Sequence, residues 1–300
     1  MPTQATAYRG RFAPSPTGPL HLGSLIAALA SYLDARHHGG SWLVRMEDID
    51  PPRAEPGAAQ RILNSLQAHG LIADEAVLYQ SSRSDAYQRA LDTLFTDGML
   101  FSCDCTRALT GPNGSCHGRC RERHASVGTP CALRVNVPSD YTVTFRDRLQ
   151  GLHSEALGQS LSDFVVKRKD GLDAYQLAVV VDDGDQGITH IVRGCDLLDS
   201  TPRQILLQEL LGYATPNYCH LPVITTRDGQ KFSKQNQAPP LNDSLAAGNL
   251  RLALRFLHQL EPPAELQQPD ALLRFAVEHW SLQQVPAQAS VPAATLGLDA

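Results

Sequence analysis

A proline- and glycine-rich segment near the start of the chain has the composition of a phosphate-binding turn. Residues 14–22 read Pro-Ser-Pro-Thr-Gly-Pro-Leu-His-Leu, and a helical pattern follows from Ser24. The first turn of a helix offers unpaired backbone N–H groups and a partial positive charge, which suit a phosphate. Gly23 has no side chain to block a ligand, and His21 can donate a hydrogen bond. We therefore expect His21, Gly23 and Ser24 to contact phosphate.

A second segment, far along the chain, carries two lysines three residues apart. It reads Lys231-Phe232-Ser233-Lys234 and follows an expected strand and an Asp-Gly turn. Two mobile ammonium groups can neutralise the charge that develops as a pyrophosphate group departs, and Ser233 can donate to a phosphate. A charged loop of this kind is usually only solvated, so the segment is informative because it occurs together with the first one.

Four of the seven cysteines fall within 18 residues and suit a metal. The expected ligands are Cys103, Cys105, Cys116 and Cys120. Their spacing fits a tetrahedral Zn²⁺ site, which would be structural because four protein ligands leave no open position. Residues 101–130 have no apolar period, so a metal would supply folding free energy that this segment lacks. His117 or His124 could replace one thiol, and a reduced cluster without metal is the alternative.

The bulk composition is that of an ordinary globular protein. The chain has 300 residues, 42% of them hydrophobic and 19% charged, and a net charge of −5. This charge argues against a protein that coats nucleic acid of any sequence, although the basic stretch 107–123 is a candidate local patch. No apolar run is long enough to span a membrane and no signal peptide is visible, so we expect a cytoplasmic protein. We expect the remaining cysteines, Cys131, Cys195 and Cys219, to be small buried residues.

Strand, turn and helix alternate along most of the chain, which is typical of a parallel α/β sheet. The pattern is interrupted near residue 101 and resumes near 187. Ser200 and Pro202 mark a helix start with a hydroxyl cap, and the last 15 residues are expected to form a loose tail. The expected strands are 8–13, 41–46, 132–137, 142–145, 187–194 and 221–225, and the expected helices are 24–36, 57–69, 84–96, 200–211, 245–260 and 271–281.

The two phosphate-contacting segments resemble the ATP-binding signatures of class I aminoacyl-tRNA synthetases of the glutamyl type. The string from Arg11 to Ser24 is similar to the glutamyl form almost residue for residue, and the resemblance covers roughly residues 8–255. It implies a Rossmann-type catalytic domain and ATP with Mg²⁺ as the substrate complex. ATP would contact His21, Gly23, Ser24, Lys231, Ser233 and Lys234, with His21, Lys231 and Lys234 catalytic. Gln235 departs from the family's pattern, which often has a second serine there.

The same resemblance implies a glutamate site. Arg11 and Arg193 would hold the carboxylate side of the substrate, Glu47 its ammonium group, and Tyr175 would also contact it. Phe12, Ala13, Pro14 and Ser15 would line the same pocket. Simpler alternatives remain for two of these residues. Glu47 could belong to a charged strand end, 45–53, with internal salt bridges, and Arg193 could pair with Asp196. The family also carries zinc in an insert at the place of the cysteine cluster.

Only 66 residues follow Lys234, too few for a stem-contact region plus an anticodon-reading domain. Among the proteins that the chain resembles, the glutamyl-Q tRNA(Asp) synthetases also lack an anticodon domain, so the resemblance implies a member of that family, which we expect to be a monomer without a membrane partner. Such an enzyme joins L-glutamate to queuosine in the anticodon of tRNA(Asp). Alternatives are a truncated glutamyl-tRNA synthetase that charges the 3′ end of tRNA(Glu), and a non-catalytic tRNA-binding paralogue. The expected domains are 1–100 and 166–240 as the catalytic halves, 101–165 as a zinc-containing insert that is similar to an acceptor-binding domain, and 241–300 as a helical stem-contact-like region and tail.

Overall fold

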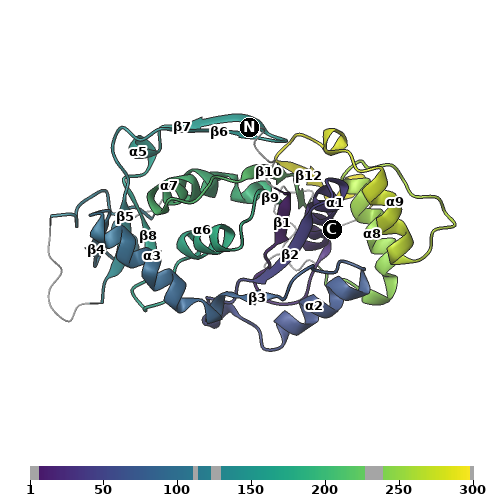
Figure 1. Ribbon diagram of the computed structural model, residues 1–300, viewed down its shortest axis with the longest axis horizontal. Coiled ribbons are helices and arrows are strands. Elements are labelled where there is room, and N and C mark those ends of the chain that lie inside the picture. Colours follow the sequence, from purple (N-terminus) through teal and green to yellow (C-terminus); the bar gives the residue numbers. More distant parts are fainter. Residues whose placement is uncertain (1–6, 111–113, 123–129, 227–238, 298–300) are drawn as a thin grey trace.

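The computed structural model describes residues 7–110, 114–122, 130–226 and 239–297 (Figure 1). The predicted phosphate-contacting residues Lys231, Ser233 and Lys234 lie outside these ranges, as do Gln235 and His124. Within the described residues no helix is long and apolar enough to cross a membrane.

Two sets of parallel strands form the centre of the molecule, as the sequence predicts. The first set is β1 (Arg9–Phe12), β2 (Ser41–Met46) and β3 (Leu78–Tyr79). The second is β9 (His190–Gly194) and β10 (Asn217–Leu221). The two sets meet where the backbone N–H of Thr189 donates to the carbonyl oxygen of Arg9 at 3.0 Å, so the two halves of the pattern are joined at β1 and β9 (Figure 1).

Helix α1 (Leu22–His37) is the central helix of the larger core. Leu25, Leu29 and Leu33 are fully buried, because the helix packs against β1 on one side and against the C-terminal helices on another. The helix begins at Leu22 and not at Ser24, so the expected start is two residues late. His21 takes the N-cap position, where its Nδ1 accepts the backbone N–H of Ser24 at 3.3 Å.

A second core lies between three other helices. Helices α3 (Ser84–Thr96), α6 (Tyr175–Asp185) and α7 (Thr201–Leu211) enclose it, and α2 (Ala58–Ala68) packs on the first core. Gly212 ends α7 with φ 71°, as its type predicts. Ser200 precedes α7 without a side-chain cap, and its Oγ instead accepts from Nε2 of Gln176 at 3.1 Å. The predicted hydroxyl cap is therefore wrong.

The segment that interrupts the α/β pattern forms antiparallel strands. A three-stranded sheet has the order β4 (Leu100–Cys103), β5 (Ala132–Asn136) and β8 (Asp163–Lys167). A hairpin, β6 (Val143–Asp147) and β7 (Gly151–Glu155), extends along one side of the molecule (Figure 1). Two short helices, α4 (Arg107–Thr110) and α5 (Leu157–Ser160), complete this part.

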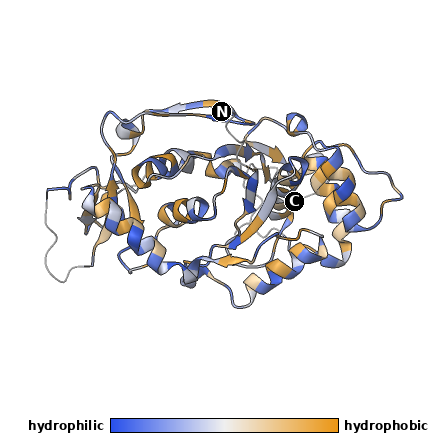
Figure 2. Cartoon of the chain, viewed as in Figure 1, coloured by the Kyte–Doolittle hydropathy of each residue, from blue (hydrophilic) through white to orange (hydrophobic). Residues whose placement is uncertain are grey.

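The C-terminal region consists of two helices followed by a short strand. Helices α8 (Ala246–Phe256) and α9 (Pro269–Glu278) show hydrophobic and hydrophilic sides in Figure 2, and their apolar sides pack on α1. Beyond them, β12 (Ser290–Pro292) pairs in parallel with β11 (Val223–Thr225). The expectation of a loose tail is thus wrong for this stretch, because Val285, Val291 and Ala293 are buried in the main core.

The three isolated cysteines differ in burial. Cys219 is fully buried in β10, as expected of a small apolar residue. Cys131 and Cys195 are partly exposed, so the same expectation is wrong for them. None of the seven cysteines, all of which lie within the described residues, forms a disulfide bond.

Candidate active site

One cavity, of about 300 Å³, collects most of the residues that the sequence singles out. It lies beside β1, β9 and the start of α1, where residues at the carboxyl ends of parallel strands converge. Ten predicted residues line it: Arg11, Phe12, Ala13, Ser15, His21, Gly23, Ser24, Glu47, Tyr175 and Arg193. Pro14 does not line it, and its carbonyl oxygen instead accepts the backbone N–H of Glu47 at 2.9 Å.

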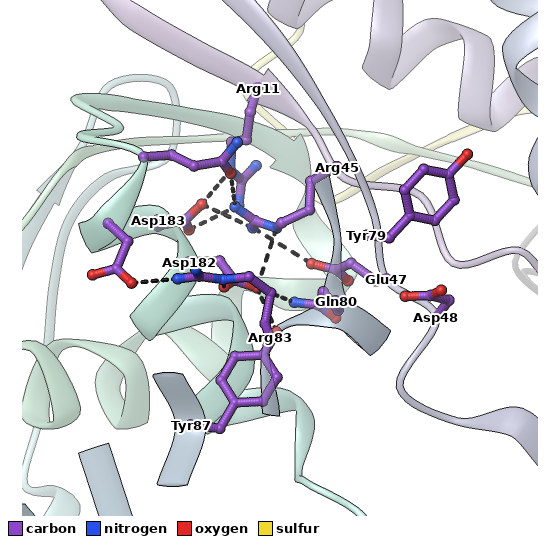
Figure 3. A network of polar contacts seen from close by, with 12 residues as sticks. Arg11, Arg45, Glu47, Asp48, Tyr79, Gln80, Arg83, Tyr87, Asp182 and Asp183 are labelled. Atoms are coloured by element: carbon purple, nitrogen blue, oxygen red, sulfur yellow. Dashed lines mark hydrogen bonds and ion pairs between the residues drawn. The ribbon is translucent and has the colours of Figure 1, made fainter. Parts of the chain in front are cut away.

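Two arginines and one aspartate form a buried ionic cluster (Figure 3), of which Arg11 lines the cavity. Arg11 donates to the two carboxylate oxygens of Asp183 over 3.1 and 3.3 Å. Nη2 of Arg45 lies 2.9 Å from Oδ1 of the same carboxylate. Burial opposes the ionisation of Asp183, but the charges of Arg11 and Arg45 hold its pKa below the usual value. The guanidinium of Arg11 is thus fixed before any substrate binds.

The neighbouring Asp182 anchors this cluster to α3. Its carboxylate accepts from Nε2 of Gln80 at 2.8 Å and from the hydroxyl of Tyr87 at 2.7 Å. Nε of Arg83 donates to it at 3.1 Å, and Nε of Arg45 lies 4.0 Å away. Because all these hydrogen-bond and ion-pair partners of Asp182 come from other elements, the network connects α6 to β2 and α3 (Figure 3).

Glu47 is a buried carboxylate with spare bonding capacity. Its Oε1 has no hydrogen-bond partner among the described residues and lies 3.5 Å from Nη2 of Arg45. Burial raises the pKa of Glu47 to about 6, against the opposing influence of Arg45 and Arg11. A buried acid with an unused acceptor oxygen suits a cationic group of a ligand. The Arg45–Glu47 ion pair also matches the internal salt bridge that the sequence left as an alternative.

The guanidinium of Arg193 donates hydrogen bonds through two of its three nitrogens. Its Nε donates to Nε2 of His220 at 3.0 Å and its Nη2 to Oγ1 of Thr201 at 2.9 Å. Its Nη1 is buried and has no hydrogen-bond partner among the described residues. The hydrogen-bond acceptors of Arg193 among the described residues are His220, Leu197 and Thr201, and not the Asp196 that the sequence offers as an alternative partner. Tyr175, the first residue of α6, completes this wall.

Sequence reasoning missed the residues that hold the cavity's cations. Asp183, Asp182 and His220 are buried and bind Arg11, Arg45 and Arg193 from positions far along the chain. One signal was available. Asp182 and Asp183 directly follow the apolar run Leu177–Val181 in one helix, where two adjacent buried acids are costly unless each meets a cation or several donors.

A second hollow, of about 570 Å³, adjoins the first. The two cavities share Ser15, Glu47 and Tyr175. Basic and acidic residues of the second lie towards the cysteine-containing segment, with Arg107 from α4 and Arg168 beyond β8. A group that entered this second hollow would therefore reach the first from the side of that segment.

The cysteine cluster forms a compact group of thiols apart from the cavity. The Sγ atoms of Cys103, Cys105 and Cys120 lie within 4.8 Å of one another, and those of Cys105 and Cys120 are 3.4 Å apart. Cys116 is buried in the same cluster but outside that closest group. Burial and the neighbouring thiols raise the pKa of Cys105 to about 12, and a thiol of this kind becomes a thiolate near neutral pH when a metal ion binds it.

Asp163 positions the chain around these cysteines. Its carboxylate accepts the backbone N–H groups of Cys116 at 2.9 Å and Gly118 at 3.2 Å, and the hydroxyl of Ser115 at 2.9 Å. Arg134 pairs with it at 2.7 Å. Although burial opposes ionisation, these bonds hold the pKa of Asp163 below its usual value. The antiparallel sheet thus fixes the loop that carries Cys116.

Comparisons with known proteins identify one family of relatives. The model of the class I tRNA synthetases (E and Q), catalytic domain, matches residues 7–109 and 112–259. A glutamyl-Q tRNA(Asp) synthetase from Xanthomonas campestris pv. campestris is 52% identical over 291 residues, which cover 96% of each chain. One from Pseudomonas aeruginosa is 51% identical over 96% of this chain and 98% of its own.

Solved structures agree with these sequence relatives. A glutamate tRNA ligase from Elizabethkingia meningosepticum, in complex with its amino acid, superposes with a TM-score of 0.80 at 26% identity. The match covers 95% of this chain and 66% of that one. The glutamate-tRNA synthetase from Elizabethkingia anophelis gives a TM-score of 0.81, also at 26% identity, over 97% and 69% of the two chains. The chain therefore belongs to the class I tRNA synthetases of the glutamyl and glutaminyl type, and within them to the glutamyl-Q tRNA(Asp) synthetase family.

Proposed function

We propose that this protein activates L-glutamate with ATP and transfers it to queuosine in the anticodon of tRNA(Asp). The observation that carries the proposal is the meeting, in one cavity, of two fixed arginines and an underbonded buried acid with the N-terminus of α1. A glutamate molecule has two carboxylates and one ammonium group, and these side chains complement all three. The relatives at about 50% identity carry the name of this activity.

The first step forms glutamyl-adenylate. An oxygen of the substrate's α-carboxylate bonds to the α-phosphorus of ATP, and the bond from that phosphorus to the bridging oxygen breaks to release pyrophosphate. His21 and the first turn of α1, which line the cavity, would bind the phosphates. Lys231 and Lys234, which lie outside the described residues, would neutralise the leaving pyrophosphate. Mg²⁺ would enter bound to ATP and supply further charge neutralisation.

The second step transfers the amino acid to RNA. A hydroxyl of the queuosine cyclopentenediol attacks the activated carbonyl carbon, the bond to the phosphate oxygen breaks, and AMP leaves with that oxygen. The second hollow supports this route, because it shares Ser15, Glu47 and Tyr175 with the glutamate cavity. The basic side chain of Arg107, which lines this hollow, suits the RNA backbone, whereas Arg168 is already paired with Asp50 and Asp170.

The four cysteines are proposed to hold one structural Zn²⁺. The donor set fits, since free thiols of Cys103, Cys105 and Cys120 already lie within bridging distance of one ion, with Cys116 buried beside them. The ion would stabilise the segment around residues 101–130 and would leave no coordination site for substrate. His117 is not needed as a replacement ligand when all four thiols bind.

We propose that the chain is organised into regions that follow these elements. Residues 1–100 and 166–240 contribute the two halves of the parallel sheet, 101–165 the zinc-containing insert, and 241–300 the helical stem-contact-like region. We propose a monomeric enzyme that acts in the cytoplasm, where ATP and tRNA are available.

The test is ATP-dependent transfer of labelled glutamate to tRNA(Asp) from cells with and without queuosine, with tRNA(Glu) alongside. Labelling of only the queuosine-containing tRNA(Asp) supports the proposal. Labelling of tRNA(Glu) regardless of queuosine would instead identify an enzyme that charges the 3′ end. Glutamate-dependent exchange of pyrophosphate into ATP separates both from a non-catalytic tRNA-binding paralogue, which would show no exchange.

A further inference from the structure

Arg193 is connected through one histidine to an aspartate at the end of the β6 strand. Nδ1 of His220 lies 2.6 Å from Oδ2 of Asp147, and its Nε2 lies 3.0 Å from Nε of Arg193. The imidazole is fully buried in β10, and the carboxylate is almost as deeply buried. The chain Asp147–His220–Arg193 thus leads from the hairpin to the wall of the glutamate cavity.

The chemistry of the arginine determines which nitrogen of the histidine carries the proton. Nε of a guanidinium can only donate, so Nε2 of His220 has to accept. The single proton of the neutral ring is then on Nδ1, from which it is donated to Asp147. Burial and the charge of Arg193 lower the pKa of His220, against the hydrogen bond that the ring donates to Asp147, which would raise it. The ring is therefore neutral, with one defined tautomer.

Asp147 is anchored so that only one of its oxygens is available to the ring. Its Oδ1 accepts the backbone N–H groups of Leu149 at 3.0 Å, Gln150 at 2.8 Å and His220 at 3.2 Å. Three donors on one oxygen fix the orientation of the carboxylate and leave Oδ2 for the imidazole. The aspartate therefore selects the tautomer, as the orienting acid of a catalytic triad does.

We propose that Asp147 and His220 are positioning residues that hold Arg193 with its Nη1 free for a carboxylate of the substrate. Thr201 and the ring of Tyr218 complete the support, since Nη2 donates to Thr201 Oγ1 at 2.9 Å and the guanidinium lies 5.3 Å from the ring centroid of Tyr218. Nη1, buried and without a hydrogen-bond partner among the described residues, is the one remaining nitrogen. The inference rests on the proposed function, because it assigns that nitrogen to glutamate.

The substitution Asp147→Asn tests the tautomer with little change of shape. Oδ1 keeps its three backbone donors, so the new amide group directs N–H towards Nδ1 of His220. The ring proton then moves to Nε2, where it faces the Nε–H of Arg193, and the arginine loses its orientation. We expect the Kd for glutamate to rise about ten- to hundredfold, while the KM for ATP changes little.

Two variants of His220 make the test independent of the aspartate. His220→Gln can donate to Asp147 through its amide nitrogen and accept from Arg193 through its oxygen, so we expect a glutamate Kd within a few-fold of wild type. His220→Ala removes both bonds and should resemble Asp147→Asn. The matched control is Asp199→Asn, at an exposed aspartate a few residues after β9, the strand that carries Arg193. This substitution should leave the glutamate Kd, the ATP KM and the tautomer of His220 unchanged.

The measurements are glutamate Kd by calorimetry, ATP KM in pyrophosphate exchange, and the ¹⁵N resonances of His220 by NMR without substrate. The inference expects the Nδ1–H tautomer in wild type and the Nε2–H tautomer in Asp147→Asn. An unchanged glutamate Kd in Asp147→Asn, or equal losses for glutamate and ATP, would overturn it. A wild-type protein that binds no glutamate would contradict the proposed function and this inference with it, whereas normal binding with an Nε2–H ring contradicts the inference alone.

Discussion

Arg11 and Asp183 form a two-point ion pair, 3.1 and 3.3 Å in length, although 171 residues separate them in the sequence. Both side chains are almost fully buried. The pair brings the first strand of one half of the sheet against a helix of the other half, at the cavity that we assign to glutamate. Folding of the two halves onto each other therefore also assembles the proposed glutamate site.

Asp183→Ala should destabilise the protein and weaken glutamate binding together. It leaves Arg11 and Arg45 buried without their shared carboxylate, and breaking a buried pair in this way costs about 3–5 kcal/mol of unfolding free energy. Denaturant unfolding measures this loss. Glu261→Gln, which breaks the exposed pair with Arg255, is the control and should cost no more than about 1 kcal/mol. Equal effects of the two substitutions would contradict the structural role of Asp183.

Glutamate binding should weaken as the pH falls through about 6. Glu47, whose pKa burial raises to about 6, must be ionised to receive the substrate's ammonium group. Between pH 7.5 and 5 the Kd should rise roughly tenfold. In Glu47→Gln this pH dependence should disappear, with weaker binding throughout, whereas Glu75→Gln, at an exposed pair with Arg9, should behave as wild type. A Kd that is independent of pH in the wild type would refute the role of Glu47.

The ionisation of Glu47 should also affect folding stability, but in the opposite direction: a rise in pH strengthens glutamate binding and lowers the free energy of unfolding. A folded-state pKa above the ordinary value of 4.5 means that the folded protein binds this proton more tightly than the unfolded chain. The resulting stability is fully present below pH 4.5 and is lost as the pH rises through about 6. Comparing the pH dependence of unfolding in wild type and Glu47→Gln isolates this contribution, and identical profiles would show that Glu47 titrates normally.

Removal of the metal should unfold the cysteine segment and spare glutamate binding. We expect about one Zn²⁺ per chain by elemental analysis, lost in Cys103→Ser and in Cys105→Ser, with increased proteolysis between residues 101 and 130. The glutamate cavity contains none of these cysteines, so the glutamate Kd should stay near that of wild type. Cys195→Ser is the control and should keep its zinc. Full zinc content in both cluster variants would exclude this site.

The final strand should contribute to stability. Val291 in β12 is buried in the main core, and Ser290, next to it, is exposed. Val291→Ala removes two buried methyl groups and should cost roughly 2 kcal/mol, whereas Ser290→Ala should change the unfolding free energy by less than about 0.5 kcal/mol. Thermal and denaturant unfolding measure both. If the two variants unfold alike, the pairing of β12 with β11 is not maintained in solution.

The sequence predicts much of the fold because its patterns are local. The strand 41–46 and the helix 84–96 have the predicted bounds, since a short apolar run in the strand, apolar residues at helical spacing in the helix, and flanking turns define them without help from distant parts of the chain. The strand β12 could not be predicted in this way. Its three residues include a proline, and it depends on pairing with β11, which lies far away in the sequence.

The candidate site, too, could be predicted from the sequence only where its residues belong to local motifs. His21, Glu47 and Arg193 follow from motifs that are short and continuous, and the structure brings them to one cavity. Asp147 and His220 lie 73 residues apart, and neither belongs to a motif. Buried polar pairs form where tertiary contacts exclude water, so their partners become visible only in the folded chain.

The measurement that tests the central claim most directly is the chemical location of the transferred glutamate. Queuosine-containing tRNA(Asp) would be incubated with the enzyme, ATP and glutamate, digested to nucleosides at mildly acidic pH to preserve the ester, and examined by mass spectrometry. The account predicts glutamate on the queuosine nucleoside and none on the 3′-terminal adenosine. Glutamate on the terminal adenosine, of tRNA(Asp) or of tRNA(Glu), would contradict it.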